Sequence, residues 1–123
     1  MNLSKFKKYI ERKIIYLATS DKKGRPNLIT VMYCKLVGKN QILITDNFMN
    51  KTRKNILQNN KVSVVCGTGE EWYQLKGMAK YLPKGKWRNI VKAMPENKGL
   101  AAKAAVLITI KEGYNLSNCK KIN

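Results

Sequence analysis

The chain of 123 residues contains no histidine and only seven acidic residues. Without histidine it cannot form a serine–histidine–aspartate triad, a histidine ligand set for zinc or haem, or the usual acid–base group near neutral pH. Seven carboxylates spread along the chain do not favour a metal cage either. The sequence therefore predicts no metal site and no catalytic side chain, and any redox chemistry would depend on a cofactor.

Cysteines are also few, and no long apolar run is present. Cys34, Cys66 and Cys119 are an odd number without C-x-x-C spacing, which fits neither a disulfide framework nor a zinc site. No apolar run approaches the roughly 18 residues of a membrane-spanning helix. The first residues lack the apolar segment of a signal peptide. We therefore expect one cytoplasmic domain over residues 1–123 with no membrane partner.

Basic residues are abundant, with 25 lysines and arginines and a formal charge of +18. Such an excess attracts nucleic acid, acidic membrane surfaces and phosphorylated small molecules. Only four of the basic residues are arginines, although base recognition and forked phosphate contacts favour arginine. The charge is therefore interpreted either as a solvated lysine-rich surface or as a nucleic-acid footprint, and composition leaves both open.

The pattern of apolar and turn-forming residues predicts a mainly β protein with short helices. Gly77 lies inside a predicted strand and indicates a bend or a close backbone approach. Helices are expected over residues 2–11, 51–58 and 84–94, strands over residues 14–19, 27–37, 41–45, 61–66, 72–82 and 104–110, and a loose tail over residues 112–123.

Six strands in a meander predict a small antiparallel barrel, because closure removes exposed strand edges. Several strands are apolar on both faces, among them residues 28–34, 42–44 and 106–110. One face of such a strand can fill the barrel, and the other needs a cover. That cover would be the helices or a second subunit.

The stretch from Thr45 to Asn55 contains the end of a strand, a loop and the start of a helix. A helix start has free N–H groups and a partial positive charge, so it favours acidic residues. This helix opens instead with Lys51, Arg53 and Lys54. Either a phosphate binds there through the amides, Lys51 and the Thr52 hydroxyl, or Asn50 caps the helix and the basic side chains point into water.

Several segments between Ile14 and Ile110 resemble a known family through their order and spacing. They are Tyr16-Leu17-Ala18-Thr19-Ser20, Gly24-Arg25-Pro26-Asn27, Ile44-Thr45, Asn50-Lys51-Thr52-Arg53-Lys54-Asn55-Ile56, Asn59-Asn60-Lys61-Val62-Ser63 and Leu75-Lys76-Gly77-Met78-Ala79. Together they resemble the FMN-binding split β-barrel family, which includes pyridoxamine 5'-phosphate oxidase-like proteins. The short chain looks most like the small bacterial FMN-binding proteins of that family.

The resemblance implies a six-stranded antiparallel split β-barrel that forms a homodimer, with FMN at the subunit interface. The strand around Val31 would line the flavin ring through its backbone. Lys51 and Thr52 would hold the phosphate, where the local pattern also allows an anion. The cofactor-binding residues implied by the resemblance are Thr30, Val31, Met32, Ile44, Thr45, Asp46, Met49, Asn50, Lys51 and Thr52. Tyr114 is a further candidate to reach the partner's flavin.

Three functions remain open at this stage. The protein could be an FMN-dependent oxidoreductase or electron carrier, in which the cofactor performs the electron chemistry. It could be a flavin store or sensor without catalytic activity. It could also be a basic barrel that binds nucleic acid through lysines and exposed aromatic side chains. The sequence indicates neither the electron donor nor the acceptor, and it does not distinguish FMN from a deazaflavin.

Overall fold

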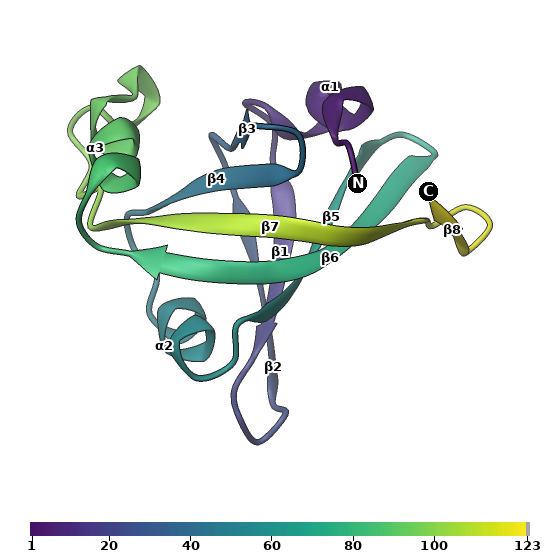
Figure 1. Cartoon of the computed structure of the whole chain (residues 1–123), viewed down its shortest axis with the longest axis horizontal. Helices are drawn as coiled ribbons and strands as arrows, with labels where there is room; N and C mark the ends of the chain where they lie inside the picture. The colour runs from purple at the N-terminus through teal and green to yellow at the C-terminus, as the bar shows by residue number, and fades with distance from the viewer. Residues whose placement is uncertain (123) are drawn as a thin grey trace.

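The computed structural model describes residues 1–122, and its framework is a single antiparallel sheet (Figure 1). Short helical segments lie at the start of the chain, at residues 51–58 and within residues 86–97. The strands are β1 (Ile15–Ser20), β2 (Pro26–Val31), β3 (Lys35–Val37), β4 (Gln41–Asp46), β5 (Lys61–Thr68), β6 (Glu71–Leu82), β7 (Ala104–Asn115) and β8 (Lys120–Ile122). The helical segments are η1 (Ser4–Phe6), α1 (Lys7–Ile10), α2 (Lys51–Gln58), α3 (Lys86–Ala93) and η2 (Pro95–Asn97).

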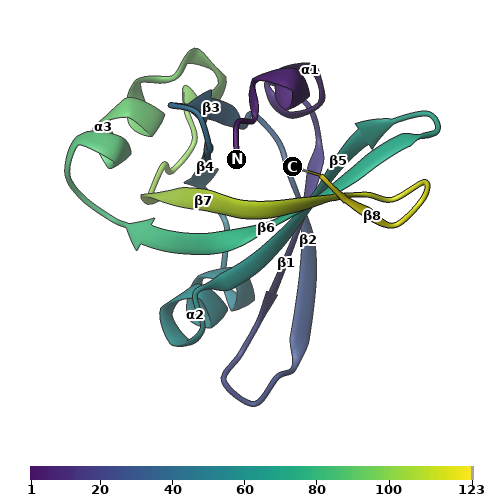
Figure 2. The ribbon, with the colours of Figure 1, turned by 45° about the vertical axis from the view of Figure 1, so that its right-hand side comes forward.

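The strands are hydrogen-bonded in the order β2-β1-β5-β6-β7-β4-β3, and β8 pairs with the end of β7. The sheet curls strongly, so that the β1–β2 hairpin crosses β6 and β7 at a steep angle (Figure 2). The concave side holds the main core, in which the most deeply buried side chains include Leu17, Ile44, Val64, Leu75 and Ile108. The expected mainly β, antiparallel architecture is confirmed.

The strand count differs from the prediction, because residues 1–122 contain eight strands and not six. The strand predicted over residues 27–37 is interrupted between Val31 and Lys35. There Tyr33 adopts a left-handed φ of 63°, which is incompatible with a continuous ladder. β2 and β3 consequently lie at opposite ends of the strand order, and the break turns Met32 and Tyr33 toward the site described below.

The tail is a second difference, since residues 112–122 are largely β-structure and not a loose segment. β6 is 12 residues long, and it offers β7 a partner well past Ile110. Tyr114 pairs with Gln74 of β6 on one side and with Lys121 of β8 on the other. Its ring also lies under the Lys76 ammonium, 5.4 Å from it. The expected role of Tyr114 at a partner's flavin stays a prediction.

The remaining boundaries agree with the sequence to within a few residues. α2 spans residues 51–58 as predicted, whereas the first helix is shorter than residues 2–11 and begins with a 3-10 turn. β5 extends two residues past the expected end of that strand at residue 66, through Gly67 and Thr68. No helix within residues 1–122 is both long enough and apolar enough to cross a membrane.

Gly77 lies where the backbones of β6 and β7 approach closely, as its position in a strand predicted. The register between the two strands shifts between Lys76 and Gly77. A Cβ atom built on Gly77 would stand 2.0 Å from the carbonyl oxygen of Thr109, well inside van der Waals contact. Only glycine fits there without separating the two strands.

α3 covers the outer face of β4 and β7, where the sequence called for a cover over two-sided apolar strands. Val91 of α3 is fully buried, and it packs in a second cluster with Leu43, Ala105 and Leu107. Ile90, the residue before Val91, remains 38% exposed. The helix therefore covers one part of the outer surface, while the outer face of the β1–β2 hairpin keeps exposed apolar side chains.

Candidate cofactor-binding site

A cavity of about 540 Å³ opens where β2 ends, β4 ends and α2 begins. Its wall combines the inward side of β2, the segment after β2, the β4–α2 loop, the first turn of α2 and one residue of the loop before β7. The lining residues are Asn27, Ile29, Thr30, Val31, Met32, Tyr33, Thr45, Asn47, Phe48, Met49, Asn50, Lys51, Thr52 and Leu100.

Eight of the ten residues that the resemblance assigned to the cofactor line this one cavity. They come from two separate stretches of the chain, residues 30–32 and residues 45–52. The other two do not line it: Ile44 and Asp46 are both fully buried behind the wall. The cavity also includes lining residues that sequence reasoning missed, among them Ile29, Phe48 and Leu100. Ile29 could have been found from its alternation with Val31, whereas nothing local indicated Leu100.

The cavity has an apolar part and a polar part. Ile29, Val31, Met32, Phe48 and Leu100 supply the apolar part. Asparagine, threonine and lysine side chains at the start of α2 and on the facing strand supply the polar part, namely Asn27, Asn50, Lys51 and Thr52. This division suits a ligand with a flat apolar group at one end and an anionic group at the other.

The polar part is fixed by a hydrogen bond between β2 and α2. The side-chain amide of Asn27 donates to the Thr52 hydroxyl over 3.2 Å, and Thr52 is only 2% exposed. This bond joins the strand to the first turn of the helix. It therefore sets the distance between the two walls at this end of the cavity.

The first turn of α2 carries no acidic residue and no side-chain cap among the described residues. Asn50, which one alternative made the cap, has φ −128° and ψ −75° and makes no capping bond through its side chain. The capping part of that alternative is therefore wrong, whereas Lys51 and Lys54 are exposed, as the alternative expected. The first N–H groups of a helix lack partners inside the helix, so the cavity is bordered by donors and by the Lys51 ammonium.

The loop between β4 and α2 is held by Asp46 from behind. The Asp46 carboxyl accepts hydrogen bonds from the backbone N–H of Met49 over 2.7 Å and from the Tyr81 hydroxyl over 2.5 Å. The Lys103 ammonium lies 3.8 Å from the same group. Burial and the hydrogen bond to Asp46 raise the pKa of Tyr81 to about 12, so its hydroxyl stays a donor at neutral pH. Asp46 thus shapes the wall from outside the cavity.

Asn97 ties the loop before β7 to the same region. Its buried side-chain amide donates to the Thr45 hydroxyl and to the Val91 carbonyl, each over 2.8 Å. Its side-chain oxygen accepts from Asn47 over 3.2 Å, and the oxygen of Asn47 in turn accepts from the backbone of Ala102 over 2.7 Å. These bonds bring the segment that carries Leu100 to the cavity.

Among residues 1–122 the lining of this cavity includes no carboxylate and no thiol. The buried thiols lie elsewhere in the core, and burial raises the pKa of both Cys34 and Cys66 to about 12, which leaves them unreactive at neutral pH. The arrangement can bind and orient a ligand, but it offers no pair of groups for acid–base catalysis.

Residues 4–117 match the family model for pyridoxamine 5'-phosphate oxidase. The chain belongs to this family. The resemblance read from the sequence is therefore confirmed. An uncharacterized protein of Methanocaldococcus jannaschii is 39% identical over 116 residues, which cover 90% of this chain and 78% of that protein.

Three solved structures share the fold. HupZ of Group A Streptococcus has a TM-score of 0.87 at 23% identity, with all of both chains covered. An FMN-binding protein of Syntrophomonas wolfei has a TM-score of 0.70 at 14% identity, over 84% of this chain and 76% of that one. HutZ, the haem storage protein of Vibrio cholerae, has a TM-score of 0.69 at 17% identity, over 94% and 95%. At these identities the likeness establishes the fold and leaves the cofactor open.

Proposed function

We propose that the protein is an FMN-binding flavoprotein with a redox role. The observation that carries the proposal is the cavity, in which an apolar part adjoins a cationic helix start. Its volume of about 540 Å³ lies within the range of about 300–1,000 Å³ that is usual for cofactor and small-molecule pockets. The residues present therefore fit a flavin with a phosphate at one end.

In this proposal the flavin ring lies along the backbone of Thr30, Val31 and Met32. The phosphate lies at the first turn of α2, where Lys51 supplies a charge and Thr52 a hydroxyl. When bound, FMN supplies the electron chemistry, and the chain contributes binding, orientation and exclusion of water. No side chain of this protein takes a catalytic role.

The proposal includes a homodimer whose second copy covers the open side of the cavity. Phe48 is 80% exposed and Met32 is 53% exposed, although both line the cavity. Leu28 is 66% exposed and Tyr16 is 37% exposed on the adjoining outer face of the β1–β2 hairpin. Apolar side chains gathered around a cavity mouth favour burial against a partner, and a symmetric pair is the commonest solution.

Two measurements on the purified protein test this function. The absorption spectrum should show flavin bands in the blue and near ultraviolet, or the colourless protein should take up added FMN. Light scattering should give a mass near twice 14.1 kDa, and Leu28→Lys should shift the mass toward the monomer. A protein that binds no FMN under any condition would overturn the flavin proposal, and a monomer with FMN fully bound would overturn the shared site.

The charge of +18 favours nucleic-acid binding as a second candidate function. A colourless protein that binds a single-stranded oligonucleotide, with an affinity that falls steeply with salt, would support it. If flavin does bind, reduction by NADH or NADPH followed by reoxidation with an electron acceptor separates a redox protein from a flavin store. HutZ shares the fold and is a haem storage protein, but none of the 123 residues of the present chain is a histidine that could ligate a haem iron. We therefore favour a flavin over haem.

A further inference from the structure

A second groove, of about 400 Å³, runs between the β1–β2 turn and the outer side of α2. Asn27 and Lys51 line both this groove and the cofactor cavity. The two spaces therefore adjoin at the polar end of the cavity, where the proposed function has the phosphate. The groove continues from that point along α2 past Lys54 to Gln58.

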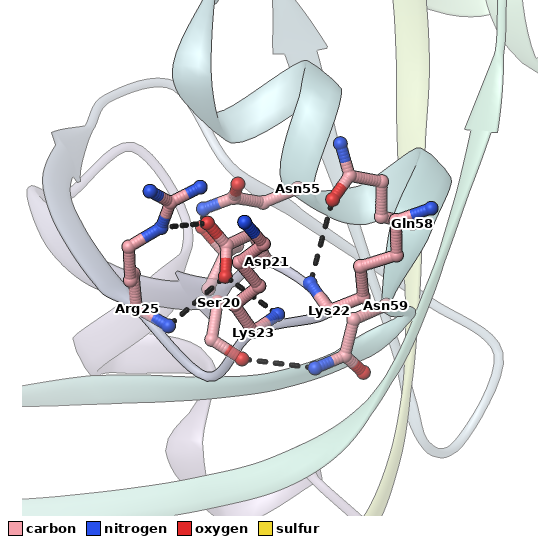
Figure 3. A network of polar contacts seen from close by, with 9 residues as sticks. Ser20, Asp21, Lys22, Lys23, Arg25, Asn55, Gln58 and Asn59 are labelled. Atoms are coloured by element: carbon pink, nitrogen blue, oxygen red, sulfur yellow. Dashed lines mark hydrogen bonds and ion pairs between the residues drawn. The ribbon is translucent and has the colours of Figure 1, made fainter.

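Beside the groove, two hydrogen bonds join the β1–β2 hairpin to the last residue of α2 and to the residue after it (Figure 3). The side-chain oxygen of Gln58 accepts from the backbone N–H of Lys22 over 3.4 Å. The side-chain amide of Asn59 donates to the Ser20 hydroxyl over 2.9 Å. A groove that is held open before any ligand arrives loses less conformational freedom on binding.

The turn itself is organised around Asp21, as Figure 3 also shows. Its carboxylate accepts from the backbone N–H groups of Lys23 and Arg25 over 2.9 and 3.0 Å, and it pairs with the Arg25 guanidinium over 2.6 Å. The single acidic residue of the groove is thus engaged with its own turn and with Arg25. Arg25 therefore balances the charge of Asp21 within the turn.

The helix side of the groove is cationic without an internal counter-charge. Lys51 and Lys54 line it, and neither forms an ion pair with any residue from 1 to 122. The remaining polar lining consists of amide side chains, namely Asn27, Asn55 and Gln58, which can donate to an anion. Two free ammonium groups and amide donors along one wall suit a phosphate group.

We propose that this groove binds a second phosphate of the ligand, attached to the phosphate that lies at the start of α2. The site then accepts an organic diphosphate, of which flavin adenine dinucleotide is the example that shares the flavin ring. Lys51 stands between the two phosphates, and Lys54 contacts only the second. This inference rests on the proposed flavin function and extends it to the class of cofactor.

The test compares FMN and flavin adenine dinucleotide by calorimetric titration of the flavin-free protein at one fixed ionic strength. The variants are Lys54→Gln and, as a matched control, Lys92→Gln, an exposed lysine of α3 that lines neither space. Because Lys54 is exposed, its contact with phosphate is partly screened. We expect Lys54→Gln to weaken dinucleotide binding about five-fold and FMN binding less than about two-fold. Lys92→Gln should leave both within about two-fold.

The possible outcomes separate this inference from the function on which it rests. If the wild-type protein binds FMN but not the dinucleotide, the second phosphate site is refuted and the flavin function stands. The same holds if Lys54→Gln and Lys92→Gln weaken the dinucleotide equally, since bulk charge then accounts for the effect. If the wild-type protein binds neither flavin, the proposed function fails and the inference fails with it.

Discussion

Lys51 is the residue at which the flavin proposal can be tested most directly, through Lys51→Ala. The side chain lines the polar end of the cavity at the first turn of α2. A charge-assisted hydrogen bond to phosphate contributes about 1.5–3 kcal/mol. Lys51 is exposed, so solvent screening puts its contribution near the lower limit. We expect FMN binding to weaken roughly ten-fold, since about 1.4 kcal/mol corresponds to that factor.

Two comparisons show whether the loss comes from the phosphate. Riboflavin carries the same ring without a phosphate, so its weaker binding should be nearly the same in Lys51→Ala and in the wild-type protein. Lys54→Ala removes an equal charge three residues along α2, from a side chain that does not line the cavity. Calorimetry or flavin fluorescence measures the affinity of the wild-type protein and of both variants for FMN and for riboflavin. Equal losses in the two variants would attribute the effect to bulk charge, and an equal loss for riboflavin would place Lys51 at the ring.

Three further predictions concern stability, each measured by urea unfolding. Asp46→Ala removes the acceptor of two hydrogen bonds and should cost about 2–4 kcal/mol, with Asp46→Asn costing less. Gly77→Ala should cost about 2–4 kcal/mol because its Cβ meets backbone, whereas Gly113→Ala, which meets only side chains, should cost under about 1 kcal/mol. Folding raises the pKa of Cys34 and of Cys66 from 9.0 to about 12, so the folded protein retains these two protons where the unfolded chain loses them. The contribution of the two thiols to the unfolding free energy should therefore stay constant below pH 9 and decrease from pH 9 to 12. The decrease should be less steep in Cys34→Ala.

Local patterns in the sequence were sufficient for most of the elements. The helix expected over residues 51–58 has the same bounds in the structure, where it is α2. The strand expected over residues 72–82 differs from β6 by one residue at its start. In each case the information lies within a few residues of the element, where periodicity reports which face is buried.

The differences arise where distant partners decide the structure. The strand predicted over residues 27–37 has a continuous apolar pattern, but it breaks because its two halves pair with different strands, β1 and β4. The polar composition after Glu112 suggested a loose tail, but β6 is long enough to pair with it. Neither pairing leaves a local signature, because backbone hydrogen bonds between strands do not depend strongly on side-chain type.

The candidate site shows the same division between local and distant information. A resemblance over consecutive residues found the two segments that line the cavity, residues 30–32 and 45–52. It could not distinguish residues on the cavity surface from those behind it, which depends on how β4 is turned against β7. Leu100 lines the cavity because the hydrogen bonds of Asn97 hold its segment there, and no residue near Leu100 in the sequence indicates these bonds.

Asp46 explains why the start of α2 remains available to an anion. It is the acidic residue that lies nearest the helix in the sequence, and it could have neutralised the first turn. Its carboxyl is instead fully buried and engaged by the backbone N–H of Met49, the Tyr81 hydroxyl and the Lys103 ammonium. Lys51 therefore keeps its charge without an ion pair among residues 1–122. The loop is shaped by a carboxyl whose charge is balanced elsewhere, and the positive end of the helix is left without an acidic side chain.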